Sequence, residues 1–530
     1  MSFELLRPQD ATLLHAQDPR APLQIGALAL FDAGPLRAED GSLRIADLRA
    51  HIASRLTGAP RFRQRLVEPA LGLGPAVWVD DPAFDVAHHV RVAALPRPGH
   101  RAGLRDLVAR LVEQPLDPAR PLWEIWVVEG VEGDRVAVIP KVSHVMADGM
   151  ALLDVVLRML DLSPDAPPSP DVPPSPDVPP SPDVPPSPGV LASAEALVRS
   201  EAAAPSDSRV PSAAAGTAAA PIGPALPVHL SLLARATVAR SRRQVAIGLG
   251  AIGQLRHPGR VVATGAGLAR AAVRARPAPA SRINRPVGRR RDMTWSRQPM
   301  AALQEVKRSQ GVSLNDVVLA AVAGATGSLL GGPGPAGRQP RPRVLVPVSI
   351  HGPTPRAEIE NRFSLMLADL PVGVDDPLER LRLVHAEMVR RKRSAETSLG
   401  AVLLAASDLV PGWLIRLIAP TVLGRQPVVN LVVTNLPGTD QPLYLLGAQL
   451  REAYPFVTVI GNISLIVGVV SYGESLGVGI TVDPDVVDDV DGFAAALDRS
   501  FADLVAAAAA DRDTVAGGDD PGQARLDDRG

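Results

Sequence analysis

The side chain whose type and setting best suit catalysis in this sequence is His144. An imidazole can accept and return a proton near neutral pH, so histidine commonly serves as a general base or acid. The chain contains ten histidines, and a lone histidine is usually just an exposed or hydrogen-bonded side chain. His144 differs because it follows a strand-like apolar run at 136–142 and precedes a helical pattern that begins near Gly149. Catalytic groups often lie at such junctions, held firmly yet reachable.

The residues after His144 favour the same interpretation. Asp148 stands just before the helix, where an N-cap is wanted, and Gly149 permits backbone angles that other residues resist. The adjacent pair His88-His89 is a weaker candidate, because its neighbours predict an ordinary strand and no orienting acid follows it. Cysteine is absent, which excludes disulfides, thiolate metal sites and a cysteine nucleophile.

Residues 143–149 read Ser-His-Val-Met-Ala-Asp-Gly and resemble the His-His-x-x-x-Asp-Gly motif of chloramphenicol-acetyltransferase-like acyltransferases and condensation domains. Within that group the chain resembles the bacterial wax ester synthase/diacylglycerol acyltransferase family, because several further blocks occur in the family's order. These blocks are Leu6-Arg7-Pro8-Gln9-Asp10-Ala11, Pro115-Leu116-Asp117, Arg120-Pro121-Leu122-Trp123-Glu124, Asn315-Asp316-Val317-Val318-Leu319-Ala320, Thr434-Asn435-Leu436-Pro437-Gly438 and Pro442-Leu443-Tyr444. The main departure is Ser143, which replaces the first motif histidine; the catalytic histidine of the family is the second, here His144.

The resemblance implies an α/β fold of two chloramphenicol-acetyltransferase-like halves, with mixed sheets and packed helices around a central cleft. It also implies an O-acyltransferase that moves a long-chain acyl group from acyl-CoA to diacylglycerol, to a long-chain alcohol, or to both. No resident cofactor or metal is expected, and acyl-CoA serves as co-substrate. The chain would thus make triacylglycerol or wax ester.

Ester formation explains why a histidine is needed. An alcohol hydroxyl attacks poorly while protonated, and a histidine with an ordinary pKa of about 6.5 can accept that proton, which contributes about 10²–10⁴-fold. Direct transfer needs no acyl-enzyme.

Three other residues have a predicted role. Asp148 either orients His144 or acts structurally, and the resemblance favours the structural role. Asn315 either donates to the substrate or oxyanion, or begins a helix with Asp316. Trp123 is predicted to be a packing residue.

Two other functions stay open. One is a related acyltransferase with a carrier-protein donor or a different alcohol acceptor. The other is a lipid-surface binding protein whose site has decayed, with Ser143 as the first symptom. The intact His144, Asp148 and Gly149 argue against decay.

Composition divides the chain into five segments. Residues 1–162 form the N-terminal half, and three Ser-Pro-Asp-Val-Pro-Pro repeats lie within a spacer at 163–190. An Ala/Arg-rich basic linker, partly helical, is expected at 191–285. The C-terminal half covers 286–512, and 513–530 is a disordered tail.

Each half has the patterns of both strands and helices. The predicted strands are 25–31, 136–139, 343–348 and 428–434, and the predicted helices are 45–56, 149–162, 300–309 and 314–330. Residues 464–482 are predicted to form a hairpin around a Gly-containing turn.

Charge and hydropathy indicate where in the cell the protein is expected. The net charge is -1, which gives no global attraction to nucleic acid. The start of the chain lacks the pattern of a signal peptide, and the apolar runs at 400–424 and 456–472 are interrupted, so a soluble protein is expected. Residues 208–291 are rich in arginine and contain no acidic residue. They either form a solvated crossover or contact anionic lipid, which would place a cytoplasmic protein peripherally at the inner membrane or at lipid inclusions.

Overall fold

A computed structural model describes residues 3–17, 21–68, 76–147, 149–165, 277–331, 341–349, 363–394 and 424–517. These residues form two six-stranded sheets with packed helices and one three-stranded sheet, so the predicted α/β class is confirmed. Most of the proline-rich spacer, most of the basic linker that is expected to be partly helical, and Asp148 lie outside the described residues.

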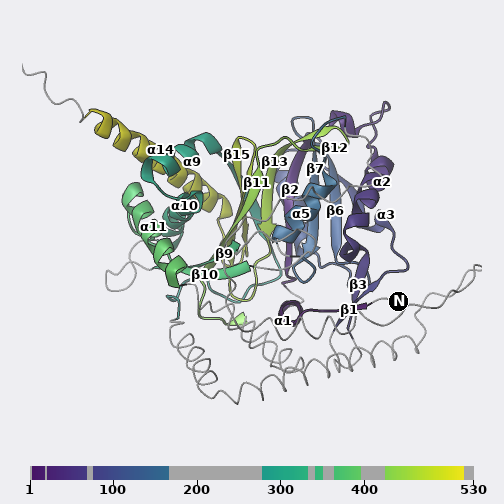
Figure 1. Cartoon of the computed structure of the whole chain (residues 1–530), viewed down its shortest axis with the longest axis horizontal. Coiled ribbons are helices and arrows are strands. Elements are labelled where there is room, and N and C mark those ends of the chain that lie inside the picture. Colours follow the sequence, from purple (N-terminus) through teal and green to yellow (C-terminus); the bar gives the residue numbers. More distant parts are fainter. Residues whose placement is uncertain are drawn as a thin grey trace, which may run out of the picture.

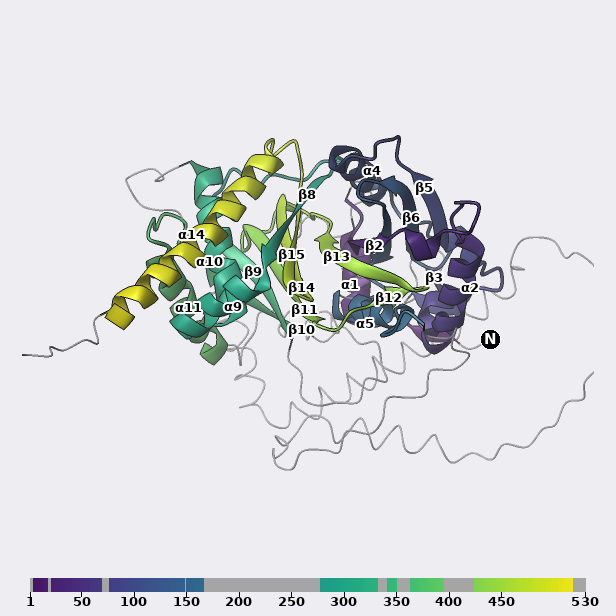
Figure 2. The ribbon, with the colours of Figure 1, turned by 90° about the horizontal axis from the view of Figure 1, so that it is seen from above.

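The first sheet combines strands from both ends of the sequence. Its order is β12-β13-β2-β7-β6-β5, where β2 is Gln24–Asp32, β5 Val90–Ala94, β6 Trp123–Val131, β7 Arg135–Ser143, β12 Tyr444–Leu445 and β13 Ala448–Val457. Only β5 and β6 are parallel. β13 pairs with β2 along nearly its whole length (Figure 2). Two strands of the predicted C-terminal half therefore complete the sheet of the first.

The second sheet has the order β10-β9-β11-β14-β15-β8. Its strands are β8 Asp292–Pro299, β9 Arg343–Ser349, β10 Phe363–Asp369, β11 Leu431–Thr439, β14 Leu465–Tyr472 and β15 Ser475–Val482. β9, β11 and β14 run parallel, and β14 with β15 form the predicted hairpin. Its outer face is covered by four helices (Figure 1): α9 Met300–Gln310, α10 Leu314–Leu330, α11 Pro377–Ser394 and α14 Val490–Gly517.

The C-terminal helix corrects one expectation. α14 continues to Gly517, so residues 513–517 of the predicted disordered tail are helical. The rest of that tail lies outside the described residues. Of the helices in the described ranges, none alone is long and apolar enough to cross a membrane; α9 and α10 pass that test only together, with a bend of 103° between them.

Both faces of β7 are covered. Val136, Val138 and Val142 pack in a core with α2 (Ile45–Arg55) and α5 (Gly149–Met159). Ala137 and Ile139 face the other way, toward α4 (Arg101–Glu113). A strand buried on both faces has a continuous apolar sequence rather than an alternating one, which explains the pattern before His144.

The two sheets approach each other through β13. A Cβ on Gly477 or Gly479 of β15 would lie 1.9 Å from the carbonyl oxygens of Ala453 and Pro455 on β13, respectively. Only glycine allows this spacing, because any side chain would overlap the facing backbone.

A second contact between the halves comes from α4. The guanidinium of Arg105 pairs with Asp292 on β8 and with Asp491 on α14, and Arg101 lies over the ring of Trp295 at 4.5 Å. The two halves are thus joined through β13 and through α4.

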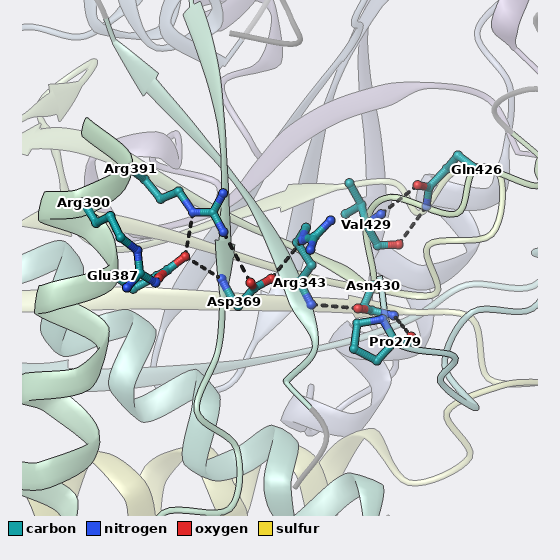
Figure 3. A network of polar contacts seen from close by, with 9 residues as sticks. All are labelled: Pro279, Arg343, Asp369, Glu387, Arg390, Arg391, Gln426, Val429 and Asn430. Atoms are coloured by element: carbon teal, nitrogen blue, oxygen red, sulfur yellow. Dashed lines mark hydrogen bonds and ion pairs between the residues drawn. The ribbon is translucent and has the colours of Figure 1, made fainter. Parts of the chain in front are cut away.

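A polar network holds Pro279, which lies near the end of the predicted linker (Figure 3). The Asn430 side chain, 2% exposed, accepts from the backbone N–H of Arg343 at 2.7 Å and donates to the Pro279 carbonyl at 2.9 Å. Arg343 also donates to Asp369 at 2.9 Å. Pro279 is therefore tied to Asn430, just before β11, and through it to the first residue of β9.

Candidate active site

His144 lies in the turn that directly follows β7. The strand ends at Ser143, and α5 begins at Gly149. The backbone N–H of His144 donates to the Leu23 carbonyl at 3.0 Å, and Met146 N–H donates to the Ser143 carbonyl at 2.9 Å. The imidazole is half-buried. The predicted strand–turn–helix setting is confirmed; the catalytic role remains a prediction.

Ser143 is buried beneath this turn, at 5% exposure. It lies directly opposite Gln24 on β2, and its backbone N–H donates to the Leu122 carbonyl at 3.0 Å. Its Oγ accepts from Val145 N–H at a long 3.4 Å. The serine therefore belongs to the support of the turn and makes little use of its hydroxyl.

Lys141, two residues before Ser143, was not singled out from the sequence. It is 1% exposed, and its Nζ donates to the carbonyls of Leu111 and Gln114 at 2.9 Å each, with Glu124 Oε2 at 3.6 Å. Burial lowers the pKa of Lys141, and the Glu124 carboxylate opposes this shift. The sequence signal that could have identified Lys141 is its occurrence as a single lysine within an otherwise apolar strand-like run.

The Pro121-Leu122-Trp123 block supports the same strand end. The Leu122 carbonyl accepts from the backbone N–H of Ser143, and the Pro121 carbonyl accepts from Trp123 N–H at 2.9 Å. Trp123 is fully buried, and its indole N–H donates to the Phe62 carbonyl at 2.7 Å. Its position in the core agrees with the predicted packing role.

The expectation of a strand around His88-His89 is wrong for residues 86–89. These residues form the one-turn helix α3 (Val86–His89). Asp85 caps it by accepting from Ala87 N–H at 2.9 Å. His89 is buried, stacks on Trp123 at 4.4 Å, and has Nδ1 2.8 Å from the Trp123 carbonyl. Burial lowers its pKa. His89 is a core residue.

Gly149 brings two distant motif blocks together. A Cβ on Gly149 would lie 3.1 Å from Cδ2 of Leu436, which belongs to β11 and to the Thr434-to-Gly438 block. The first turn of α5 therefore contacts the second sheet where Gly149 has no side chain. Asp148 lies outside the described residues, so its two alternative roles stay open.

Asn315 and Asp316 begin α10. The Asp316 carboxylate accepts from Ser313 N–H at 2.9 Å, while Ser313 Oγ accepts from Asp316 N–H at 3.2 Å, which forms a capping box. His385 Nδ1 lies 2.9 Å from the same carboxylate. α10 packs mainly on α9, α11 and α14. Asp316 thus starts the helix, and the neighbouring Asn315 is half-buried.

A small open hollow lies against the turn after His144. Val145 and Met146 line it together with the N-terminal segment and Trp78; the other lining residues are Glu4, Leu5, Arg7, Asp10 and Arg61. Arg61 pairs with Glu4 at 2.6 Å and lies over Trp78 at 4.6 Å. The N-terminal block therefore meets the motif turn in space. Among the described residues, no group of three or more His, Asp and Glu side chains is placed to hold a metal ion.

Comparisons with known proteins match nearly the whole chain. A family model for the wax ester synthase/diacylglycerol acyltransferase catalytic domain matches residues 6–318, and one for the WS/DGAT C-terminal domain matches 359–505. A probable diacylglycerol O-acyltransferase of Mycobacterium tuberculosis is 31% identical over 504 residues, which cover 94% of this chain and 95% of that protein. A putative diacylglycerol O-acyltransferase of Mycobacterium bovis matches equally well, at 31% over the same lengths.

Solved structures agree on the fold. The wax ester synthase/diacylglycerol acyltransferase from Marinobacter aquaeolei matches with a TM-score of 0.59 and 22% identity, over 96% of this chain and 100% of that one. The first condensation domain of the calcium-dependent antibiotic synthetase matches with a TM-score of 0.54 and 16% identity, over 96% and 97%. The predicted two-lobed fold is confirmed.

Proposed function

Because the chain belongs to the wax ester synthase/diacylglycerol acyltransferase family, we propose that this acyltransferase moves a long-chain acyl group from acyl-CoA to the hydroxyl of diacylglycerol. Long-chain alcohols are the second class of acceptor. The names of the relatives that match nearly end to end support diacylglycerol as the main one.

The observation that carries the mechanism is the position of His144 at a firmly held turn whose helix contacts the second sheet. In the proposed step the acceptor hydroxyl oxygen forms a bond to the thioester carbon while its proton passes to His144. The tetrahedral intermediate then breaks its carbon–sulfur bond. The coenzyme A thiolate leaves and takes the proton back from the imidazolium, so the products are an ester and free coenzyme A.

Replacement of His144 tests this step. His144→Gln keeps side-chain size and polarity but removes the base, so coenzyme A release from a long-chain acyl-CoA with diacylglycerol should fall at least about 100-fold. The unfolding temperature should stay close to that of the parent. His88→Gln, at an exposed histidine of α3, is the matched control and should leave turnover unchanged. Undiminished turnover in His144→Gln would rule out the mechanism.

A side-by-side assay tests the substrates. Diacylglycerol and a hexadecanol-like alcohol are supplied in turn with the same acyl-CoA, and triacylglycerol and wax ester are measured. Both products are expected, with more triacylglycerol. Turnover with a carrier-bound acyl thioester and none with free acyl-CoA would overturn the donor assignment.

Contact with a lipid surface is a separate part of the proposal. The arginine-rich, acid-free segment 208–291 would bind anionic headgroups, at about 1 kcal/mol for each basic residue near the surface. This would hold the enzyme peripherally at the inner membrane or at lipid inclusions, where its apolar substrates collect. Deletion of 208–276, which leaves Pro279 and its contact to Asn430 in place, should weaken binding to anionic vesicles more than to neutral ones while the unfolding temperature is kept. Equal loss on both would favour the solvated crossover.

A further inference from the structure

A buried threonine from the far end of the chain holds the segment that supports His144. Thr458 directly follows β13 and is 0% exposed. Its Oγ1 accepts from Gln24 N–H at 2.9 Å and lies within donating distance of the carbonyls of Pro22, at 2.7 Å, and Gln24, at 3.0 Å. Its own N–H donates to the Gln24 carbonyl at 3.0 Å. One residue thus binds the backbone on both sides of Leu23.

Leu23 carries the contact to the turn. It is buried, and its carbonyl accepts the backbone N–H of His144 at 3.0 Å. Gln24 is fixed further, because its Nε2 donates to the Gln114 carbonyl, which Lys141 Nζ also contacts. Residues 22–24 therefore form a short splint between Thr458 and His144.

The splint lies where the chain passes from one sheet to the other. β13 belongs to the first sheet, and the residues after Thr458 contact the second lobe. Val287 N–H donates to the Gly461 carbonyl at 2.9 Å, and Asn284 Nδ2 donates to the Asn462 carbonyl at 3.0 Å. The placement of Thr458 thus depends on how the two sheets are joined.

We propose that Thr458 is a positioning residue that sets the place of His144 through the splint of residues 22–24. The inference rests on the proposed role of His144 as general base. Without the Thr458 hydroxyl, Gln24 N–H and the Pro22 carbonyl lose a buried partner, so the splint relaxes and the turn shifts with it. A misplacement of about 1 Å can cost about 100-fold in rate. Substrate contacts elsewhere are untouched, so kcat falls while KM stays.

Three variants test this. Thr458→Val keeps the shape and removes the hydroxyl, and Thr458→Ser keeps the hydroxyl. Thr481→Val is the matched control, because Thr481 on β15 is also buried, at 1% exposure, and its Oγ1 has no hydrogen-bond partner among the described residues. We expect kcat to fall at least about 10-fold in Thr458→Val, with both KM values within about twofold. Thr458→Ser should recover most of the rate, and Thr481→Val should match the parent.

Several outcomes would overturn the proposal. A lower unfolding temperature with full kcat in Thr458→Val would mean that the residue only stabilises the fold, and a serine variant as slow as the valine variant would mean that the hydroxyl is not the cause. If Thr458→Val does not fold, Thr458→Ala replaces it, and an alanine variant with the parent's kcat overturns the inference. His144→Gln distinguishes failure of the proposed function from failure of this inference. Its activity tests the role of His144 as general base. An inactive His144→Gln together with a fully active Thr458→Val would refute only the positioning role of Thr458.

Discussion

Ser143 stands where the family motif has its first histidine, and its surroundings explain why the replacement is compatible with the turn. The bond from its backbone N–H to Leu122 holds the strand end whichever side chain is present. The side chain is buried opposite Gln24 and makes one long contact. The support of His144 at this position is therefore mainly backbone.

This gives a prediction for Ser143→Ala. Loss of one weak hydrogen bond should change the free energy of unfolding by no more than about 1 kcal/mol, and kcat should stay within about threefold of the parent. Coenzyme A release and denaturant unfolding measure the two quantities. A loss comparable to that of His144→Gln would assign the hydroxyl a chemical role.

His89 gives a prediction for pH. Burial lowers its pKa in the folded chain below the value of about 6.5 expected after unfolding. Below that pH the unfolded chain binds the proton more readily, so the stability present above about pH 6.5 is lost as the pH falls toward the folded pKa. His89→Phe removes this contribution. It should lower stability near pH 7.5, through the lost bond to Trp123, but flatten the decline toward pH 5.5.

Unfolding free energies at the two pH values check this expectation. An acid-side decline as steep in His89→Phe as in the parent would contradict it. His88→Gln, at the exposed neighbouring position, controls for loss of a histidine as such.

At the scale of elements, α10 shows how a motif can be structural. Ser313 and Asp316 satisfy each other's backbone groups at the helix start, and Asp316 also holds His385 on α11. These contacts give Asp316 a role in the fold of the second lobe. The predicted alternative in which Asn315-Asp316 begins a helix is thereby supported for Asp316.

The matching prediction concerns Ser313→Ala. Removal of an N-cap oxygen typically costs about 1 kcal/mol, and Asp316→Ala should cost more because the contact to His385 is lost as well. Denaturant unfolding measures both. Turnover of folded Ser313→Ala should equal that of the parent, and a selective loss of kcat would instead connect the start of α10 to the reaction.

At the scale of the whole molecule, β13 joins the two lobes. It completes the first sheet beside β2 and lies against glycines of the second. The same strand leads directly to Thr458 and hence to the splint under His144. The arrangement of the sheets and the geometry of the turn therefore depend on one strand.

Gly477→Ala tests this dependence. The added Cβ would lie 1.9 Å from the Ala453 carbonyl, so β13 must shift and the fold should lose at least about 1–3 kcal/mol, the usual cost of overpacking. kcat should fall too, because the shift reaches Thr458. Gly103→Ala is the control: it lies in α4 with open space around it and should stabilise the chain by about 0.5–1 kcal/mol. Full activity and stability in Gly477→Ala would refute the close contact.

Local patterns alone predicted much of this molecule. The apolar run before His144, the helix from Leu314 to Leu330 and the hairpin of β14 and β15 follow from residue periodicity, because those elements bury their own side chains over short stretches. The order of the motif blocks identified the family and, with it, the two-lobed fold.

Tertiary structure decided the contacts between residues that are distant in sequence. The pairing of β13 with β2, the burial of Lys141, the contact of Gly149 with Leu436 and the splint from Thr458 to His144 all join such residues. Periodicity shows which face of an element is apolar, but the same face fits many partners. The partner is selected only when the sheets close on each other and every buried N–H and carbonyl must find a hydrogen bond.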